Sequence, residues 1–231
     1  MEIKGDFHIH TKYSHEPGII GPFGSARARY GPEDVFKRAR KIGLDAVAIT
    51  DHDTIDAIEI AKKVHKHYQD IIFIPGEEVT STAGHIIALG INELIPKGLT
   101  PKETVQEIKK QGGVAIAPHP FAPYGIRNWI FQIPFDGIET LNVWGAFLRL
   151  NRKAQHAFKL IDVAAIGASD AHSISTIGKM YTKLDVRERT PEAVLDAICK
   201  KRTEAVSVLK IRDLLKATLL GIGQTLIEWK K

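Results

Sequence analysis

Short apolar runs that alternate with longer helical patterns are the feature that most restricts how this chain can fold. Such alternation is typical of repeated β-α units around a mainly parallel sheet. The run Ala46-Val-Ala-Ile49 is apolar throughout, as a strand buried on both faces requires. We expect the run at 71–74 to stop at Pro75. The expected strands are residues 46–49, 71–74, 85–89, 114–117, 137–140 and 163–166.

The helical patterns carry recognisable end signals. Pro32 stands where proline is favoured at the first helical position, and Gly43 ends the same apolar stripe. A second helix is expected through Ala57, Ile60, Ala61 and Val64. The 231 residues contain no Ser/Gly-rich linker, low-complexity tract or internal repeat. We therefore expect one domain over residues 1–231, with a last helix at about 210–229.

Composition indicates an ordinary globular protein. Hydrophobic residues make up 44% and charged residues 26% of the chain. Cys199 is the single cysteine, so no internal disulfide can form and a reducing compartment is favoured. The sequence shows no secretory signal and no apolar stretch as long as a membrane span. We expect a cytoplasmic protein without membrane contact, whose net charge of +5 would attract an anionic substrate.

Histidine and carboxylate residues gather where the expected strands end. Active sites of parallel barrels and open α/β sheets are built at the carboxyl ends of the strands. His85 opens the strand after Glu78, whereas His65, His67 and His156 lie in helical patterns and are assigned to solvated faces. The residues at or just inside strand ends are His8, His10, His52, Glu78, His119, Asp170 and His172.

The first pair, His8 and His10, indicates metal binding. Residues two apart on a strand point to the same face, so both imidazoles can reach one ion. The pair alone is a weak signal, but burying so many titratable groups together is expensive unless cations compensate. Imidazoles with few carboxylates suit Zn, Mn or Fe better than Ca or Mg. A set this large predicts two or three divalent ions, which could activate a water for hydrolysis.

Five motifs in order resemble the PHP (polymerase and histidinol phosphatase) superfamily, over residues 1 to about 180. The resemblance implies a distorted (β/α)7 TIM-like barrel with a trinuclear metal centre at the carboxyl ends of the strands. The motifs are His8-Ile-His10-Thr11, Thr50-Asp-His-Asp53, Pro75-Gly-Glu-Glu78, Pro118-His-Pro120 and Ser169-Asp-Ala-His172.

The resemblance also implies a ligand set. His8, His10, Glu78 and Asp170 would hold the first ion, and Glu78 would bridge to a second ion held by His85 and His119. The third ion would take His15, His52 and His172. His8, His10, Glu78, His119, Asp170 and His172 are also the expected catalytic residues. Asp51 and Asp53 either orient imidazoles or form a turn and the N-cap of the next helix.

Substrate contacts are expected from cations near the strand ends, because the free oxygens of a phosphoester need donors beyond the metals. Arg127 is the first candidate, with Asn128 beside it in the loop after His119. Lys179 and Arg29 are weaker candidates, for which an exposed surface cation is the better interpretation. The loop 17–30 either covers the site or is an ordinary surface loop.

The main hypothesis is hydrolysis of a phosphomonoester or phosphodiester by a metal-bound hydroxide. The alternatives are a metal-dependent hydrolase of a C–N bond, or an interaction or processing module that acts with a partner. The expected substrate is a small phosphorylated molecule, with a nucleotide among the candidates.

Nucleic-acid binding is left open by the sequence. His119 follows His85 by only 34 positions, whereas PHP proteins that act on nucleotides commonly carry a helical insertion there. The basic patches Lys62-Lys63 and Lys200-Lys-Arg202 lack the interleaved aromatic residues of a stacking platform.

Overall fold

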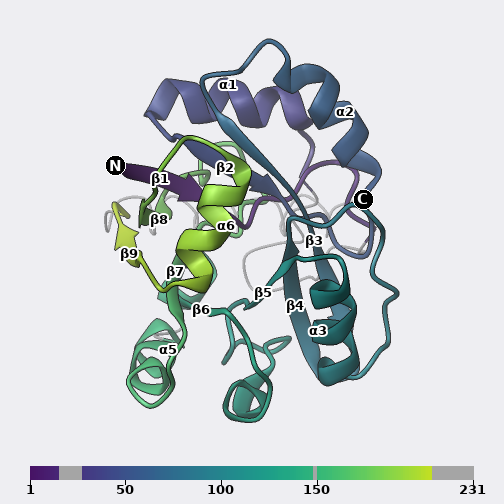
Figure 1. Ribbon diagram of the computed structural model, residues 1–231, viewed down its shortest axis with the longest axis vertical. Helices are drawn as coiled ribbons and strands as arrows, with labels where there is room; N and C mark the ends of the chain where they lie inside the picture. Colours follow the sequence, from purple (N-terminus) through teal and green to yellow (C-terminus); the bar gives the residue numbers. More distant parts are fainter. Residues whose placement is uncertain (16–27, 148–149, 210–231) are drawn as a thin grey trace, which may run out of the picture.

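The computed structural model describes residues 1–15, 28–147 and 150–209. Most of the loop at 17–30 and the helix expected at 210–229 lie outside the described residues. The strands curve into a nearly closed barrel, with helices packed around its outside (Figure 1). The expected single-domain TIM-like α/β barrel is thereby confirmed.

The described strands form one sheet in the order β7-β6-β5-β4-β3-β2-β1-β8-β9. The strands are β1 (Glu2–Asp6), β2 (Ala46–Ile49), β3 (Ile72–Ser81), β4 (Gly84–Leu89), β5 (Val114–Ala117), β6 (Gly137–Asn142), β7 (Ala164–Ala168), β8 (Met180–Asp185) and β9 (Thr203–Ser207). The helices are α1 (Pro32–Ile42), α2 (Asp56–His65), α3 (Pro101–Lys110), the 3-10 helix η1 (Arg127–Phe131), α4 (Val143–Phe147), α5 (Leu150–Phe158) and α6 (Pro191–Cys199).

The sheet is less parallel than the sequence predicted, because β4 and β8 run antiparallel to both of their neighbours. Among the expected strands, β3 departs furthest from its predicted bounds. The expected stop at Pro75 is wrong, because β3 continues to Ser81 and pairs antiparallel with β4 from Gly76↔Leu89 to Ser81↔Gly84. Gly76 permits this close pairing, since a Cβ there would lie 2.8 Å from the carbonyl oxygen of Ala88. Glu78 therefore lies within a strand, not after one.

The interior of the barrel is filled from one end. Along β2, Ala46 and Ala48 face the interior while Val47 and Ile49 pack outward with α1, as the period of two requires. Helix α6 joins the interior cluster and contacts β3, β5 and β8. The cluster contains Ala46, Val114 and Ala164, the first residues of their strands. Because α6 fills that end, the carboxyl ends of the parallel strands are left for a polar site.

The barrel closes where the segments after β1 and β7 meet. Ile9 forms a parallel bridge with Ala171, and the His10 amide donates to the Ala171 carbonyl at 3.1 Å. Asp6 is fully buried, and its carboxylate accepts hydrogen bonds from the backbone amides of Ser169 and Gly178 at 3.0 and 2.8 Å. The closure brings the motif after β1 and the motif after β7 together at the same end of the barrel.

Helix α1 begins at Pro32 as expected, and Gly43 ends it in the left-handed region with φ 74°. Placing His65 on a solvated face is wrong, because its Nε2 lies 2.6 Å from the Ile71 carbonyl oxygen and its ring lies against Phe36. No helix in the described part of the chain is long and apolar enough to span a bilayer.

Thr182 tests the closure of the barrel. Its buried hydroxyl accepts from the Gly167 amide at 3.0 Å and donates to the Gly167 carbonyl at 2.9 Å, which joins β7 to β8. Thr182→Val should lower the free energy of unfolding by about 2 kcal/mol, because it leaves two backbone groups unpaired. Denaturant unfolding measures this loss. Thr182→Ser keeps the hydroxyl and should lose less than half as much; equal losses would contradict this role.

Candidate metal centre

His8 and His10 follow β1 and point into the barrel mouth. Both are fully buried, and their Nε2 atoms lie 3.0 Å apart. Ile9 between them points outward into the cluster packed by α1 and α2. The extended backbone after β1 thus sends alternate side chains to opposite faces, as expected from the spacing.

Four ligand atoms converge around one point at this mouth. Glu78 Oε2 lies 3.0 Å from His8 Nε2 and 3.2 Å from His10 Nε2. Asp170 Oδ1 lies 3.4 Å from His8 Nε2 and 3.2 Å from His10 Nε2. Ligands of a tetrahedral zinc at about 2.0–2.1 Å lie about 3.3–3.4 Å from each other. The spacing therefore fits a small divalent ion held by these four side chains.

The second oxygen of Glu78 serves another pair of histidines. Glu78 Oε1 lies 3.1 Å from His85 Nδ1 and 3.0 Å from His119 Nε2. His85 is the second residue of β4, and the β3-β4 hairpin brings its ring to Glu78. His119 follows β5, which pairs with β4 and so brings the second ring to the same carboxylate. A carboxylate with its two oxygens in two different clusters has the geometry of a bridging ligand.

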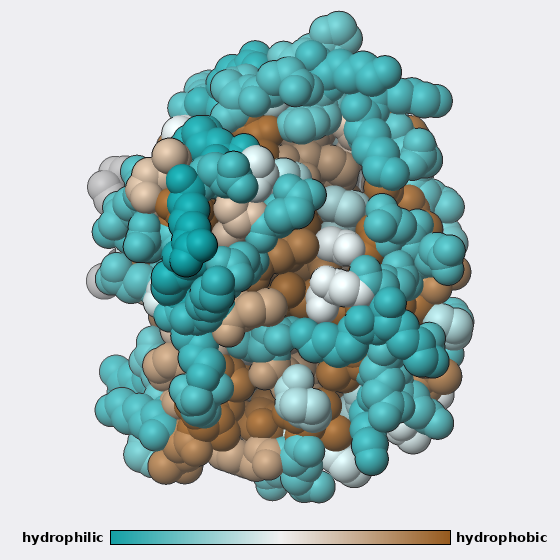
Figure 2. All heavy atoms as spheres, in the orientation of Figure 1, coloured by the Kyte–Doolittle hydropathy of each residue, from teal (hydrophilic) through white to brown (hydrophobic). Residues whose placement is uncertain are grey.

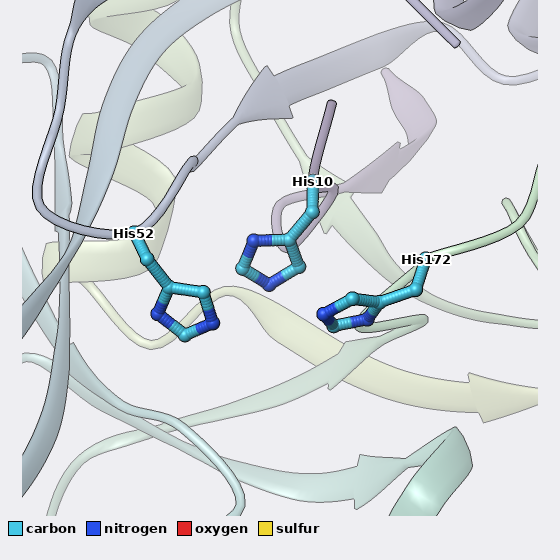
Figure 3. Close-up of side chains that lie close together, drawn as sticks. All are labelled: His10, His52 and His172. Atoms are coloured by element: carbon cyan, nitrogen blue, oxygen red, sulfur yellow. The ribbon is translucent and has the colours of Figure 1, made fainter. Parts of the chain in front are cut away.

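A third cluster joins His10, His52 and His172 (Figure 3), whose rings point toward one another. The ring centroids of His10 and His52 lie 4.5 Å apart, and those of His10 and His172 lie 4.3 Å apart. His15 does not join the clusters that the described side chains form: it is exposed, and its Nε2 lies 3.5 Å from an Asp56 carboxylate oxygen.

Two of the converging residues adopt backbone conformations that side chains other than glycine rarely take. His119 has φ 29° and Asp170 has φ 49°. Such conformations cost of order 1–3 kcal/mol each and persist where the surroundings impose them, often at functional sites. The strain at both strand ends is consistent with a site that fixes ligand positions.

Charge coupling inside the cluster raises the pKa values of the buried histidines that face carboxylates. Burial lowers the pKa of His8, but Asp170, Glu78 and Glu139 outweigh it and raise that pKa well above the ordinary value. Burial also opposes the charge on His10, yet hydrogen bonds to Asp170 and Glu78 raise its pKa to about 9. Without an ion, protons on these rings neutralise the carboxylates.

The pKa values of the other members of the cluster are lowered. Burial raises the pKa of Glu78 and of Asp170, but the surrounding histidines overcome it and hold both values well below normal. Burial lowers the pKa of His52 to about 2 and of His172 to about 4. Ionised carboxylates and neutral imidazoles are the protonation states that metal ligands require.

Glu139 on β6 is a supporting residue that the sequence interpretation missed. Its Oε1 lies 2.8 Å from His8 Nδ1, and its Oε2 accepts from the His119 amide at 2.8 Å. A carboxylate that accepts from Nδ1–H fixes the tautomer of a histidine and leaves Nε2 free to bind a metal. The available signal was an acidic residue inside the run Gly137-Ile-Glu-Thr140 of a buried strand.

Asn142 and Trp144 extend this support to Asp170. Asn142 Nδ2 donates to Glu139 Oε2 at 2.8 Å and to Asp170 Oδ2 at 3.3 Å. Trp144 Nε1 donates to the Asp170 carbonyl oxygen at 2.9 Å. Nothing in the spacing of the sequence pointed to either residue.

Asp51 and Asp53 hold neighbouring segments. The Asp51 carboxylate accepts from the backbone amide and the hydroxyl of Thr11, which fixes the turn after His10. The N-cap alternative for Asp53 is wrong, because Ile55 precedes α2, and Asp53 Oδ1 instead accepts from the Thr80 amide at 2.7 Å. Asp53 therefore ties the His52 segment to β3.

Most of the candidate substrate contacts are exposed to solvent. Arg127 and Asn128 are exposed at the start of η1, and Arg127 takes φ 52°. Their loop reaches the histidines, since the His85 amide donates to the Tyr124 carbonyl at 2.9 Å. Lys179 is half-buried before β8, and Arg29 is exposed.

The fold and the clusters define a barrel protein with groups of side chains that could hold divalent metal ions. A family model described as PHP-associated matches residues 149–203. An uncharacterised protein of Methanocaldococcus jannaschii is 44% identical over 147 residues, which cover 62% of this chain and 83% of that protein. The chain belongs to the PHP superfamily.

Solved structures share the fold at low sequence identity. One is a two-domain protein from Bacteroides vulgatus that contains a predicted PHP-like metal-dependent phosphoesterase, with a TM-score of 0.68 and 21% identity over 95% of this chain and 69% of that chain. Another is a lesion-specific endonuclease from Pyrococcus furiosus, with a TM-score of 0.59 and 17% identity over 89% of this chain and 58% of that chain.

Replacing Glu139 should weaken metal binding without unfolding the protein. In Glu139→Gln, the single carbonyl oxygen can accept from His119 N and Asn142 Nδ2, which leaves the amide NH₂ facing His8 Nδ1, so the Nδ1–H of His8 loses its acceptor and His8 its fixed orientation. Loss of such a partner typically costs about 10- to 100-fold in metal affinity. Titration calorimetry with Zn or Mn measures the change.

Glu77→Gln is the matched control. Glu77 is also buried on β3, but it faces away from the cluster and accepts from the Ile95 amide. Burial raises the pKa of Glu77 to about 8, so the carboxyl is mostly protonated at neutral pH and glutamine resembles it. The control should bind metal as the unaltered protein does; equal losses in both variants would contradict the role of Glu139.

Metal affinity should rise with pH. The pKa of His10 is about 9 in the metal-free protein, so below that pH an ion must displace a proton. Each proton released changes the apparent affinity by about tenfold per pH unit, up to the pKa. Calorimetry between about pH 6.5 and 8.5, in buffers of different ionisation enthalpy, measures both slope and proton release. Replacing the exposed His67 by Gln should leave the slope unchanged; a flat profile would contradict the coupling.

Proposed function

We propose that this protein is a metal-dependent hydrolase of phosphoesters. The observation that carries the proposal is the convergence of four ligand atoms from His8, His10, Glu78 and Asp170 at metal-ligand spacing. Zn, Mn or Fe suits this nitrogen-rich set. Ions held there would lower the pKa of a water molecule and polarise a phosphoryl oxygen.

The proposed roles of the side chains follow from their contacts. His8, His10, Glu78 and Asp170 would hold one ion, and Glu78, His85 and His119 would hold a second. His52 and His172 would hold a third ion with His15, whose side chain would first have to leave Asp56. Glu139 keeps His8 in the tautomer that presents Nε2.

Arg127 is proposed as the contact for the phosphate oxygens, with Asn128 beside it and Lys179 as a further candidate. A guanidinium offers paired donors that match phosphate geometry. The strained backbone at Arg127 projects its side chain from the loop that carries His119 and touches His85. This arrangement would bring a charge-matching donor to the side of the cluster open to substrate.

Metal-loaded protein should hydrolyse 4-nitrophenyl phosphate or bis(4-nitrophenyl) phosphate, measured by release of nitrophenolate. Asp170→Asn should lower kcat by about 100-fold or more, because it removes a charged ligand. Asp162→Asn, in an exposed ion pair with Lys201, is the control and should keep full activity. Full activity in Asp170→Asn, or no turnover of any phosphoester with Mn or Zn, would refute the proposal.

Arg127→Ala should raise KM for a phosphoester by about 10- to 100-fold while changing kcat less, as expected when a charge-assisted contact to substrate is lost. The KM of Arg127→Lys should lie between those of the unaltered protein and of Arg127→Ala. An unchanged kcat/KM in Arg127→Ala would remove this residue from substrate binding and would favour hydrolysis of a C–N bond.

A further inference from the structure

A groove lies between the loop that follows His119 and helix α5. It has a volume of about 490 Å³ and is lined by Phe121, Phe131, Arg152, Lys153, His156 and Leu160. In Figure 2, hydrophobic atoms gather at the lower end of the molecule, where Figure 1 draws α5. The groove therefore combines an apolar floor with a cationic rim.

Three exposed aromatic side chains lie on the segment 121–131, which also supplies the groove residues Phe121 and Phe131. Tyr124, Trp129 and Phe131 are 47%, 42% and 47% exposed, and they are the exposed aromatics among the described side chains. Leu160 across the groove is 69% exposed. Single exposed apolar residues are ordinary, but a cluster indicates a binding surface.

The charge around the groove has one sign. Residues 117–135 and 140–161 contain no Asp or Glu, although the chain has 27 acidic residues in total. Within the described part of the chain, Arg152 and Lys153 form no ion pair. By contrast, Lys62 on α2 pairs with Glu59. Unpaired cations beside exposed aromatic rings favour an anionic partner that also carries flat apolar groups.

The loop that lines one side of the groove also contacts the histidine cluster. Phe121 lies two residues after His119, whose Nε2 contacts Glu78. The ring of Tyr124 stacks on His85 with centroids 5.6 Å apart and planes at 12°. An elongated ligand in the groove could therefore extend to the metal cluster.

We propose that this groove binds single-stranded nucleic acid and directs one of its phosphodiesters to the metal cluster. Bases would stack on the aromatic rings, while Arg152 and Lys153 would contact backbone phosphates. The inference rests on the proposed phosphoester hydrolysis. Hydrolysis of a bound strand consumes one water and breaks one P–O ester bond, which leaves a phosphomonoester end and a hydroxyl end.

Binding of a fluorescein-labelled 12-nucleotide oligodeoxythymidine, followed by fluorescence anisotropy, tests the groove in the full chain. Phe131→Ala and Lys153→Glu should each weaken binding by about 5- to 100-fold, since stacking of one base is worth about 1–3 kcal/mol. The controls are Leu94→Ala, an exposed apolar residue elsewhere, and Lys63→Glu, an equal charge change on α2. Both controls should bind as the unaltered protein does, and affinity should fall as salt rises.

Turnover of bis(4-nitrophenyl) phosphate in the same preparations separates the two proposals. The groove variants should hydrolyse this small diester at the unaltered rate, with unchanged thermal unfolding. Oligonucleotide binding without turnover would refute the hydrolase but keep the groove. Turnover without oligonucleotide binding, equal binding by groove and control variants, or binding only to phosphatidylglycerol vesicles would overturn the groove proposal.

Discussion

The structure depends on Glu78, a buried carboxylate surrounded by imidazole rings. One oxygen faces His8 and His10, and the other faces His85 and His119. A buried carboxylate is expensive unless its charge is compensated, and here protons or metal ions must supply that compensation. The chemistry of this barrel mouth therefore depends on one buried carboxylate whose negative charge must be compensated.

The rest of the barrel serves to hold those groups in place. The hairpin of β3 and β4 brings Glu78 and His85 together, and the bridge between Ile9 and Ala171 brings His10 to Asp170. Helix α6 fills the opposite end with apolar side chains. Glu139 and Asn142 link His8 to Asp170 through hydrogen bonds, and these bonds fix the orientation of both side chains.

The sequence predicted the barrel and the ends of α1, because period, proline and glycine are local signals. Five ordered motifs predicted the superfamily. Sequence could not predict the course of β3, since its continuation beyond Pro75 depends on pairing with β4 and on the missing side chain of Gly76. The sequence interpretation missed Glu139 because its role depends on contacts with His8 and His119, which are distant from it in the chain. The assignment of His15 as a ligand came from resemblance alone and stays a prediction.

A crystal structure of the protein grown with Mn or Zn, with anomalous scattering recorded at the metal edge, tests the central claim most directly. The account predicts an anomalous peak bonded to His8 Nε2, His10 Nε2, Glu78 Oε2 and Asp170 Oδ1 at about 2.0–2.2 Å. A second peak is expected beside Glu78 Oε1, His85 and His119. A barrel mouth without a metal peak under these conditions, or a metal bound only at surface residues, would contradict it.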